Sequence, residues 1–201
     1  MRANLSWILL VAMAAQLHGA SPASGYGYAE AEDPAVAIFR DGVTSARKGD
    51  FAQATIKAKE ALALIADHKH NGASLAPRID EAAKSKNAPA MAEILANVVY
   101  LSLKEKLEVN ISTSLKDFNQ CKARLFLARK NYLDVLDGNL KKNKPEDSLA
   151  IIKGFDEALA ALGNPGLFGI GRKPADLARF TQTARKIEAT IEGFYTRFVQ
   201  Q

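Results

Sequence analysis

Apolar residues from position 34 onward recur at three- and four-residue steps, the spacing of amphipathic α-helices. No stretch alternates apolar and polar residues between turn signals, as a half-buried strand would. The pattern therefore predicts an all-α fold: an antiparallel helical bundle with an N-terminal helical hairpin. The clearest periodicity is a heptad-like seam near the end of the chain, formed by Leu177, Phe180, Ala184, Ile187, Ile191, Phe194 and Phe198.

Capping residues define the front of the predicted fold, residues 34–84. Asp33 and Pro34 begin a helix that ends at Gly49, because an acidic cap followed by proline favours a helix start. Asp50 begins a second helix in the same way. A short helix follows before the chain reaches Pro89.

Residues 89–201 form the predicted bundle. The first long helical pattern begins at Pro89 and meets poor helix formers at residues 110–114, where we expect a break; one continuous helix is the alternative. A new helix is predicted over residues 115–140. Pro145 begins the next helix, and Pro174 begins the last.

The predicted helix over residues 115–140 carries positive charge on its apolar face. Lys122 and Arg129 project from that face, so their stems extend past the core edge, or they pair with buried acids, or they bind an anion. Residues 115–144 hold eight lysines and arginines against three aspartates. The apolar face is predicted to consist of Leu115, Phe118, Leu125, Phe126, Leu133, Leu136 and Leu140.

The first 23 residues have the layout of a secretory signal peptide. Arg2 precedes an apolar run over residues 5–15, and small residues follow up to a cleavage site predicted after Ala23. The apolar run is too short to span a bilayer. We therefore expect an exported protein, periplasmic or secreted, with a flexible leader over residues 24–33 and a single helical domain over 34–201.

The composition limits the kinds of disulfide, metal and catalytic site that the protein can form. The 201 residues include one cysteine and three histidines, which excludes a disulfide framework, an iron–sulfur cluster and a cysteine-rich zinc site. Cys121 lies in a helical, apolar stretch and is expected to be buried, although an unpaired cysteine in an exported protein leaves dimerisation open. No nucleophile-elbow or nucleotide-binding spacing is present, so a binding role is favoured over catalysis.

Two histidines meet in one predicted turn. His68 and His70, with Asp67 and a further acid such as Asp80 or Glu81, are the residue types that hold zinc or copper. An exposed polar turn is the alternative. We expect no resident cofactor otherwise.

The segment over residues 163–174 is unusually rich in both glycine and apolar residues. Either it folds as a hydrophobic lid over the end of the bundle, or it is an exposed tip that docks a partner or a membrane surface. Phosphate binding is a weaker hypothesis, because glycine-rich phosphate loops normally follow a strand. The candidate contact residues are Leu167, Phe168, Ile170, Arg172 and Lys173.

Residues 35–66 resemble a single tetratricopeptide-type helix pair, and no second copy follows. The resemblance implies peptide or protein binding; a generic tight hairpin is the alternative. It rests on small residues at close helix contacts and on the turn between them: Ala46, Gly49, Asp50, Phe51, Ala54, Ala58, Ala61 and Leu62.

These patterns together predict an exported, non-catalytic helical bundle that acts as an interaction module of the cell envelope. Nucleic acid is not expected as a partner, because the excess of basic residues is modest and no nucleic-acid recognition motif is present. The expected partner is an envelope protein or an anionic envelope surface. A bundle that binds a small ligand or a divalent metal through His68 and His70 is the alternative. No transmembrane span is expected in the mature chain.

Overall fold

The fold is all-α, as the spacing of apolar residues predicts. A computed structural model describes residues 32–65, 72–166 and 170–198. Within these ranges no strand forms beyond isolated bridges, and no helix is long and apolar enough to cross a membrane.

The front of the molecule is a tight helical hairpin followed by a short helix. The caps are as predicted: the carboxylates of Asp33 and Asp50 accept the backbone N–H groups of Ala35 and Gln53, each at 2.9 Å. Gly49 makes the turn with a φ of +82°, a conformation that favours glycine. The elements are α1 (Pro34–Arg47), α2 (Phe51–Leu64), a 3-10 turn (Gly72–Leu75) and α3 (Ala76–Lys84).

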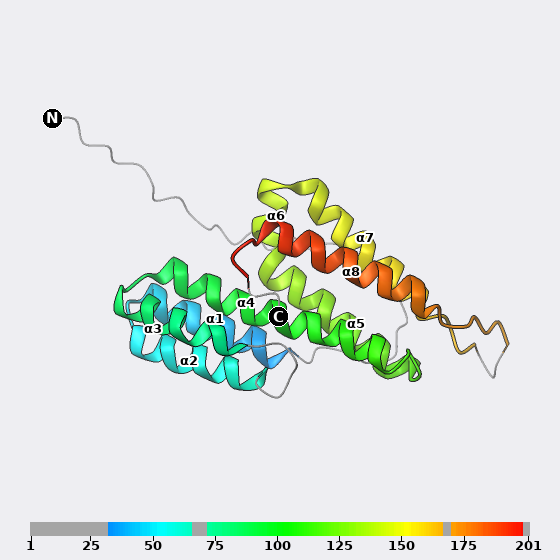
Figure 1. Cartoon of the computed structure of the whole chain (residues 1–201), viewed down its shortest axis with the longest axis horizontal. Coiled ribbons are helices and arrows are strands. Elements are labelled where there is room, and N and C mark those ends of the chain that lie inside the picture. Colours follow the sequence, from blue (N-terminus) through cyan, green and yellow to red (C-terminus); the bar gives the residue numbers. More distant parts are fainter. Residues whose placement is uncertain (1–31, 66–71, 167–169, 199–201) are drawn as a thin grey trace, which may run out of the picture.

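Helix α4 (Ala88–Ser112) runs through the whole molecule. Figure 1 shows helices α1 to α3 against its first part. The remaining elements are α5 (Phe118–Asn131), a π-helical turn (Tyr132–Leu136), α6 (Asp137–Asn143), α7 (Pro145–Ala161) and α8 (Leu177–Phe194). Of these, α5, the π-helical turn and α8 contact the second part of α4, and α6 and α7 pack on those three.

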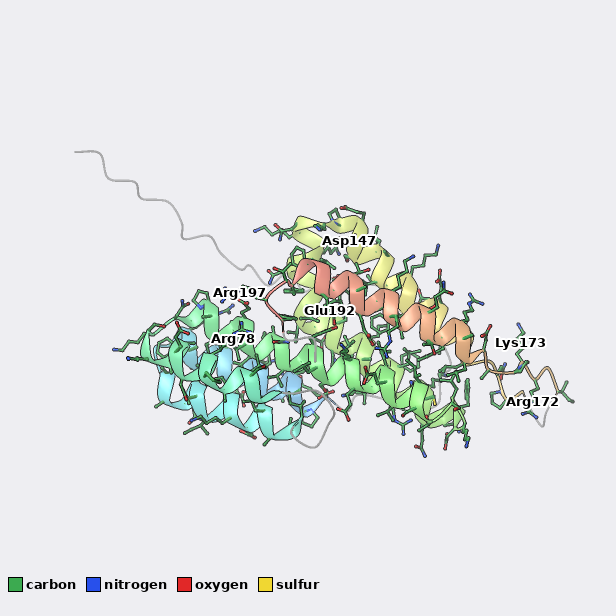
Figure 2. All side chains as sticks on the ribbon, viewed as in Figure 1. Arg78, Asp147, Arg172, Lys173, Glu192 and Arg197 are labelled. Atoms are coloured by element: carbon green, nitrogen blue, oxygen red, sulfur yellow. The ribbon has the colours of Figure 1, made fainter. Side chains whose placement is uncertain are left out.

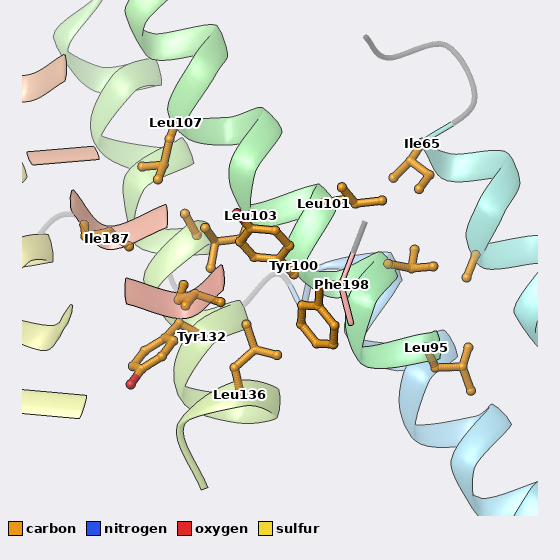
Figure 3. Packing of buried hydrophobic residues seen from close by; sticks show 14 of the residues in the cluster. Ile65, Leu95, Tyr100, Leu101, Leu103, Leu107, Tyr132, Leu136, Ile187 and Phe198 are labelled. Atoms are coloured by element: carbon orange, nitrogen blue, oxygen red, sulfur yellow. The ribbon is translucent and has the colours of Figure 1, made fainter. Parts of the chain in front are cut away.

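One hydrophobic core joins the two groups of helices. Leu95 and Leu101 of α4 meet the front helices, while Leu103 and Leu107 of the same helix face α5 and α8 (Figure 3). Each fully buried side chain of this kind contributes roughly 1.5–3 kcal/mol relative to exposure. The shared helix therefore holds both groups in a single unit.

The predicted break after α4 is confirmed. The helix ends at Ser112, and the hydroxyl of Thr113 donates to the carbonyl of Val109 at 2.8 Å. Ser114 and Leu115 follow with φ of 52° and 56°, the left-handed region that ends a helix. The next helix begins at Phe118, three residues later than predicted, because Asp117 provides its cap.

The apolar face predicted over residues 115–140 is partly wrong. Phe126 and Leu133 are each 42% exposed. Phe126 follows the buried Leu125, and because neighbouring helical residues point about 100° apart, Phe126 points away from the buried face. The N–H of Asp137 donates to the carbonyl of Tyr132, five residues back, and this π-helical turn shifts the register further on. The face that is buried consists of Cys121, Leu125, Ala128, Tyr132, Leu136 and Leu140.

The last helix is shorter at both ends than its heptad pattern indicates. It begins at Leu177 rather than Pro174, because the carboxylate of Asp176 caps it. It ends at Phe194, so Phe198 lies beyond the helix. That ring is nevertheless buried, and it stacks on Tyr195 with 4.5 Å between the ring centroids.

Candidate functional site

A short hairpin between α7 and α8 projects from one end of the bundle (Figure 1). Asn164 and Lys173 close it by two backbone hydrogen bonds, and the side chain of Asn164 accepts the N–H of Gly166 at 2.9 Å. Gly163 stands at its base with a φ of +74°. A Cβ there would lie 2.4 Å from the carbonyl oxygen of Lys173, so only glycine fits.

The hairpin exposes an isoleucine next to two cations. Ile170 is 81% exposed, so for this residue the lid interpretation is wrong. Arg172 and Lys173 are also exposed, and Figure 2 shows both at the outer end of the molecule. The other two candidate contact residues, Leu167 and Phe168, lie outside the described residues.

A groove of about 380 Å³ lies at the base of the hairpin. It is formed where the turn between α4 and α5 meets the two arms of the hairpin. Of the described residues that line it, Lys116, Arg172 and Lys173 are cationic and none is acidic. No ion pair involves these three side chains in the described part of the chain. The nearest acids in sequence, Asp117 and Asp176, are used as helix caps.

Leu115 and Phe118 give the same groove an apolar part, with prolines on the opposite wall. Leu115 can occupy this place only because the turn holds it at positive φ. We call the groove and the exposed residues of the hairpin the basic hairpin end, defined by Lys116, Ile170, Arg172 and Lys173. A surface of this kind, with cations around apolar groups, can bind an anionic group that is attached to an apolar one.

Lys122 and Arg129, the two cations predicted on the apolar face of α5, have different surroundings. The ammonium of Lys122 lies 5.9 Å from the ring centroid of Phe118 and 5.6 Å from that of Phe126, within cation–π range. Arg129 pairs with Asp156 of α7 at 3.1 Å. Asp156 is 59% exposed, so this ion pair lies at the core edge rather than inside it.

The predicted metal-binding turn, with Asp67, His68 and His70, lies outside the described residues. Asp80, one of the acids considered as a further ligand, has an oxygen 3.5 Å from the ammonium of Lys59. Within the ranges that the structure describes, no three histidine, cysteine or acidic side chains gather as a metal site. Metal binding by this turn stays a prediction.

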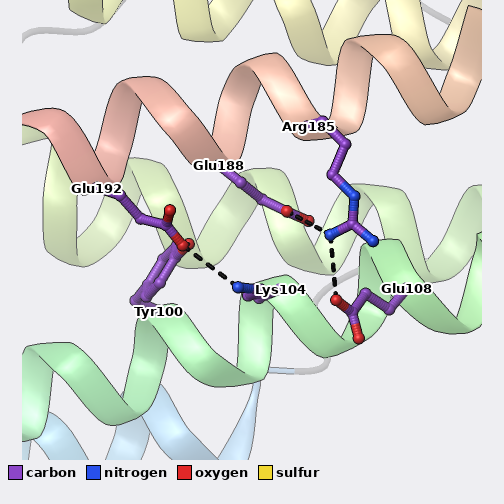
Figure 4. A network of polar contacts seen from close by, with 6 residues as sticks. All are labelled: Tyr100, Lys104, Glu108, Arg185, Glu188 and Glu192. Carbon is purple, nitrogen blue, oxygen red and sulfur yellow. Dashed lines mark hydrogen bonds and ion pairs between the residues drawn. The ribbon is translucent and has the colours of Figure 1, made fainter. Parts of the chain in front are cut away.

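The sequence did not predict a polar network that joins α4 and α8 (Figure 4). Glu192 of α8 accepts hydrogen bonds from the hydroxyl of Tyr100 and, at 3.3 Å, from the ammonium of Lys104. Arg185 bridges Glu188, at 2.6 Å, and Glu108 of α4, at 3.2 Å. The only sequence signal is the spacing of Arg185, Glu188 and Glu192 along one helix face, which is common on exposed helices.

Glu188 is the buried member of this network. It is only 4% exposed, and its Oε1 atom has no hydrogen-bond partner among the described residues. Burial raises the pKa of the carboxyl above its ordinary value, although Arg185 and Lys104 act in the opposite direction. The buried hydroxyl of Tyr100 also has a raised pKa, because of burial and its hydrogen bond to Glu192. The partners of these groups all come from α4 and α8, so we assign them to packing between the two helices.

A second buried ion pair fastens the start of α1. The carboxylate of Asp33 contacts the ammonium of Lys106 and accepts hydrogen bonds from Ser102 and Asn131. Burial alone would raise the pKa of Asp33, but Lys106 and the hydrogen bonds hold it below its ordinary value. Asp33 is therefore an integral part of the helical domain.

No family model, curated protein or solved structure matches the chain. The tetratricopeptide resemblance of residues 35–66 therefore stays a prediction. Cys121 is buried, as expected, and its carbonyl accepts a hydrogen bond from Asn110 at 2.9 Å.

Proposed function

We propose that this protein is an exported, non-catalytic binding module that attaches to an anionic surface of the cell envelope through the basic hairpin end. The observation that carries the proposal is the groove, in which Lys116, Arg172 and Lys173 meet without an acidic lining residue. Ile170 supports it, because this exposed apolar side chain belongs to the same hairpin as Arg172 and Lys173.

The chemistry of the basic hairpin end fits a lipid surface. A lysine or arginine near an anionic bilayer contributes about 1 kcal/mol, and burying one isoleucine contributes about 2 kcal/mol. Three cations and Ile170 together give roughly 5 kcal/mol, which corresponds to a dissociation constant of about 0.2 mM. Binding of this strength is reversible and depends on salt.

Export is the second support. The expected signal peptide would carry the protein to the compartment in which anionic envelope lipids are exposed. Arg172 and Lys173 lie at one extremity of the molecule, so they can meet a flat surface (Figure 2).

Co-sedimentation with vesicles tests the proposal. The purified protein is mixed with vesicles of phosphatidylglycerol and phosphatidylcholine, or of phosphatidylcholine alone, at low and at high salt. The account predicts binding to the anionic vesicles that falls as salt rises. Arg172→Glu/Lys173→Glu should weaken that binding by two orders of magnitude or more, on the order of 1 kcal/mol for each charge removed and as much again for each one introduced.

The chain offers a matched control. Lys141 and Lys142 of α6 are adjacent, exposed cations away from the hairpin, and Lys141→Glu/Lys142→Glu changes the net charge equally. It should retain most of the binding. Equal loss in both double variants would mean that overall charge, rather than the hairpin, attracts the protein. Absence of binding to either vesicle would overturn the lipid surface and leave an envelope protein as the partner to seek.

A further inference from the structure

A second cavity lies away from the hairpin. An open cleft of about 600 Å³ lies where α1, α4, α6 and the residues after α8 come together. This volume is in the usual range for small-molecule sites, which form preferentially between helices and between structural units. Its cations and those of the hairpin lie well apart in Figure 2, as the labels of Arg197 and Arg172 show.

Small residues and a fixed aromatic wall shape the cleft. Ala92 and Ala96, one turn apart on α4, line it on one side and leave the space open. On the other side Tyr195 stacks on Phe198, and its ring meets that of Phe194 edge-on with 4.8 Å between the centroids. The hydroxyl of Tyr195 donates to a backbone carbonyl of the π-helical turn at 2.7 Å. The wall is therefore in place before any ligand binds, which lowers the entropic cost of binding.

Both acidic residues that line the cleft are already paired with cations. Glu93 already has two partners, Arg78 at 3.3 Å and Arg197 at 3.2 Å, and Figure 2 shows both arginines in this region. Asp134 pairs with Lys130 at 2.8 Å.

Arg47, at the end of α1, lines the cleft as well. Within the described ranges it makes no ion pair, and Glu93 and Asp134, the two acids that line the cleft, already pair with other cations. An anion can bind at Arg47 without displacing an existing ion pair.

We propose that this cleft binds a small amphipathic anion, an acyl or aryl carboxylate, with its apolar part against the aromatic wall and its carboxylate at Arg47. The aromatic wall favours a partly apolar ligand over a small, fully hydrated anion, and the guanidinium of Arg47 favours an anion over an apolar cation. The proposal does not depend on the basic hairpin end.

A fluorescent probe of the same chemistry tests the cleft. Anilinonaphthalene sulfonate carries an aryl group and an anion, and its emission rises in an apolar site. Decanoate, below its micelle-forming concentration, should displace the bound probe, whereas decyltrimethylammonium of similar chain length and opposite charge should displace it at least tenfold less well.

Two neighbouring cations provide the matched variants. Arg47→Glu should weaken decanoate binding about tenfold, while Lys48→Glu makes the same charge change at an exposed residue that does not line the cleft and should have little effect. Ala96→Leu should fill the space and lower the number of probe sites, with the thermal unfolding curve as a check on folding.

Equal displacement by the two detergents, or equal loss in Arg47→Glu and Lys48→Glu, would overturn the proposal. The comparison of the two detergents and that of the two charge variants do not use Ala96→Leu. Arg47→Glu and Lys48→Glu should both fold, because each changes an exposed side chain.

Discussion

Asn164 and Lys173 exchange two backbone hydrogen bonds, of 2.9 Å and 2.8 Å, and this pair fixes the base of the hairpin that presents Ile170. The same pairing places the ammonium-bearing side chain of Lys173 in one groove with Lys116, a residue from the distant turn between α4 and α5. The candidate site therefore depends on the geometry of this base.

Replacing Gly163 tests that dependence. Gly163→Ala places a methyl group 2.4 Å from the carbonyl oxygen of Lys173 at a φ of +74°, so we expect a loss of roughly 1–3 kcal/mol in the free energy of unfolding. Urea unfolding followed by circular dichroism measures it. Gly193→Ala, where the new Cβ meets nothing within 4 Å in α8, should leave stability unchanged or raise it by up to about 1 kcal/mol. Equal stability of both variants would show that the hairpin base is not constrained.

Breaking the ion pair of Asp33 should be costly. Asp33→Asn leaves the ammonium of Lys106, which is 17% exposed, without its charged partner, and we expect a loss of about 3 kcal/mol at neutral pH. Because the folded-state pKa of Asp33 is lowered, its stabilisation is present above the ordinary pKa of 3.8 and is lost as pH falls through the folded-state pKa.

The difference between wild type and Asp33→Asn should therefore shrink in acid, as unfolding curves at several pH values would show. Asp41→Asn, at an exposed residue of α1, serves as the control and should change stability by less than about 0.5 kcal/mol. A pH-independent difference would contradict the assigned role of the Asp33 charge.

Glu188 should have the opposite pH dependence. Its pKa is raised by burial, so the folded state favours the protonated carboxyl, and the stability that Glu188 contributes falls as pH rises from its ordinary pKa of 4.5 through the folded-state value. Glu188→Gln imitates the neutral form, and Arg185 keeps its pairing with Glu108. We expect the variant to be more stable than wild type at neutral pH, with the advantage disappearing in acid.

Unfolding curves at acidic and neutral pH give the measurement, with Glu157→Gln of α7, whose side chain is 43% exposed, as the control. A variant that is less stable than wild type at neutral pH would show that the ion pair with Arg185 outweighs the cost of burying the Glu188 charge.

Local sequence signals predict much of the fold. Asp33 with Pro34, Gly49 and Asp50 act on their immediate neighbours, so their effect on helix ends can be inferred directly from the sequence. The break after Ser112 follows from the same local competition for backbone hydrogen bonds.

The errors in α5 and α8 have non-local or cooperative causes. A π-helical turn at Tyr132 changes the helical period without a sequence mark, so Leu133 does not lie on the buried face that its spacing predicts. Pro174 resembles a helix start, yet the chain around it closes the hairpin against Gly163, and the helix begins only after Asp176.

The candidate site is predictable in part. Composition singles out the glycine-rich segment that contains Ile170, Arg172 and Lys173, because apolar residues are unusual in a solvent loop. Nothing in the sequence indicates that Lys116 lies near these residues, because its turn meets the hairpin only in the packed bundle. The cleft around Arg47 escapes sequence reasoning for the same reason, because its walls come from separate parts of the chain.

An indole introduced in the hairpin tests directly whether the protein attaches to an anionic surface through this hairpin. Trp7, the only tryptophan of the chain, lies in the segment expected to be removed, so Ile170→Trp gives the processed protein a single indole at the exposed tip. Leu149→Trp, at a 67% exposed residue of α7, is the control. The account predicts that the emission of the Ile170→Trp variant shifts to the blue on phosphatidylglycerol vesicles and returns at high salt, with no shift for the control. An unshifted emission from Ile170→Trp in protein that sediments with these vesicles would contradict attachment through the hairpin.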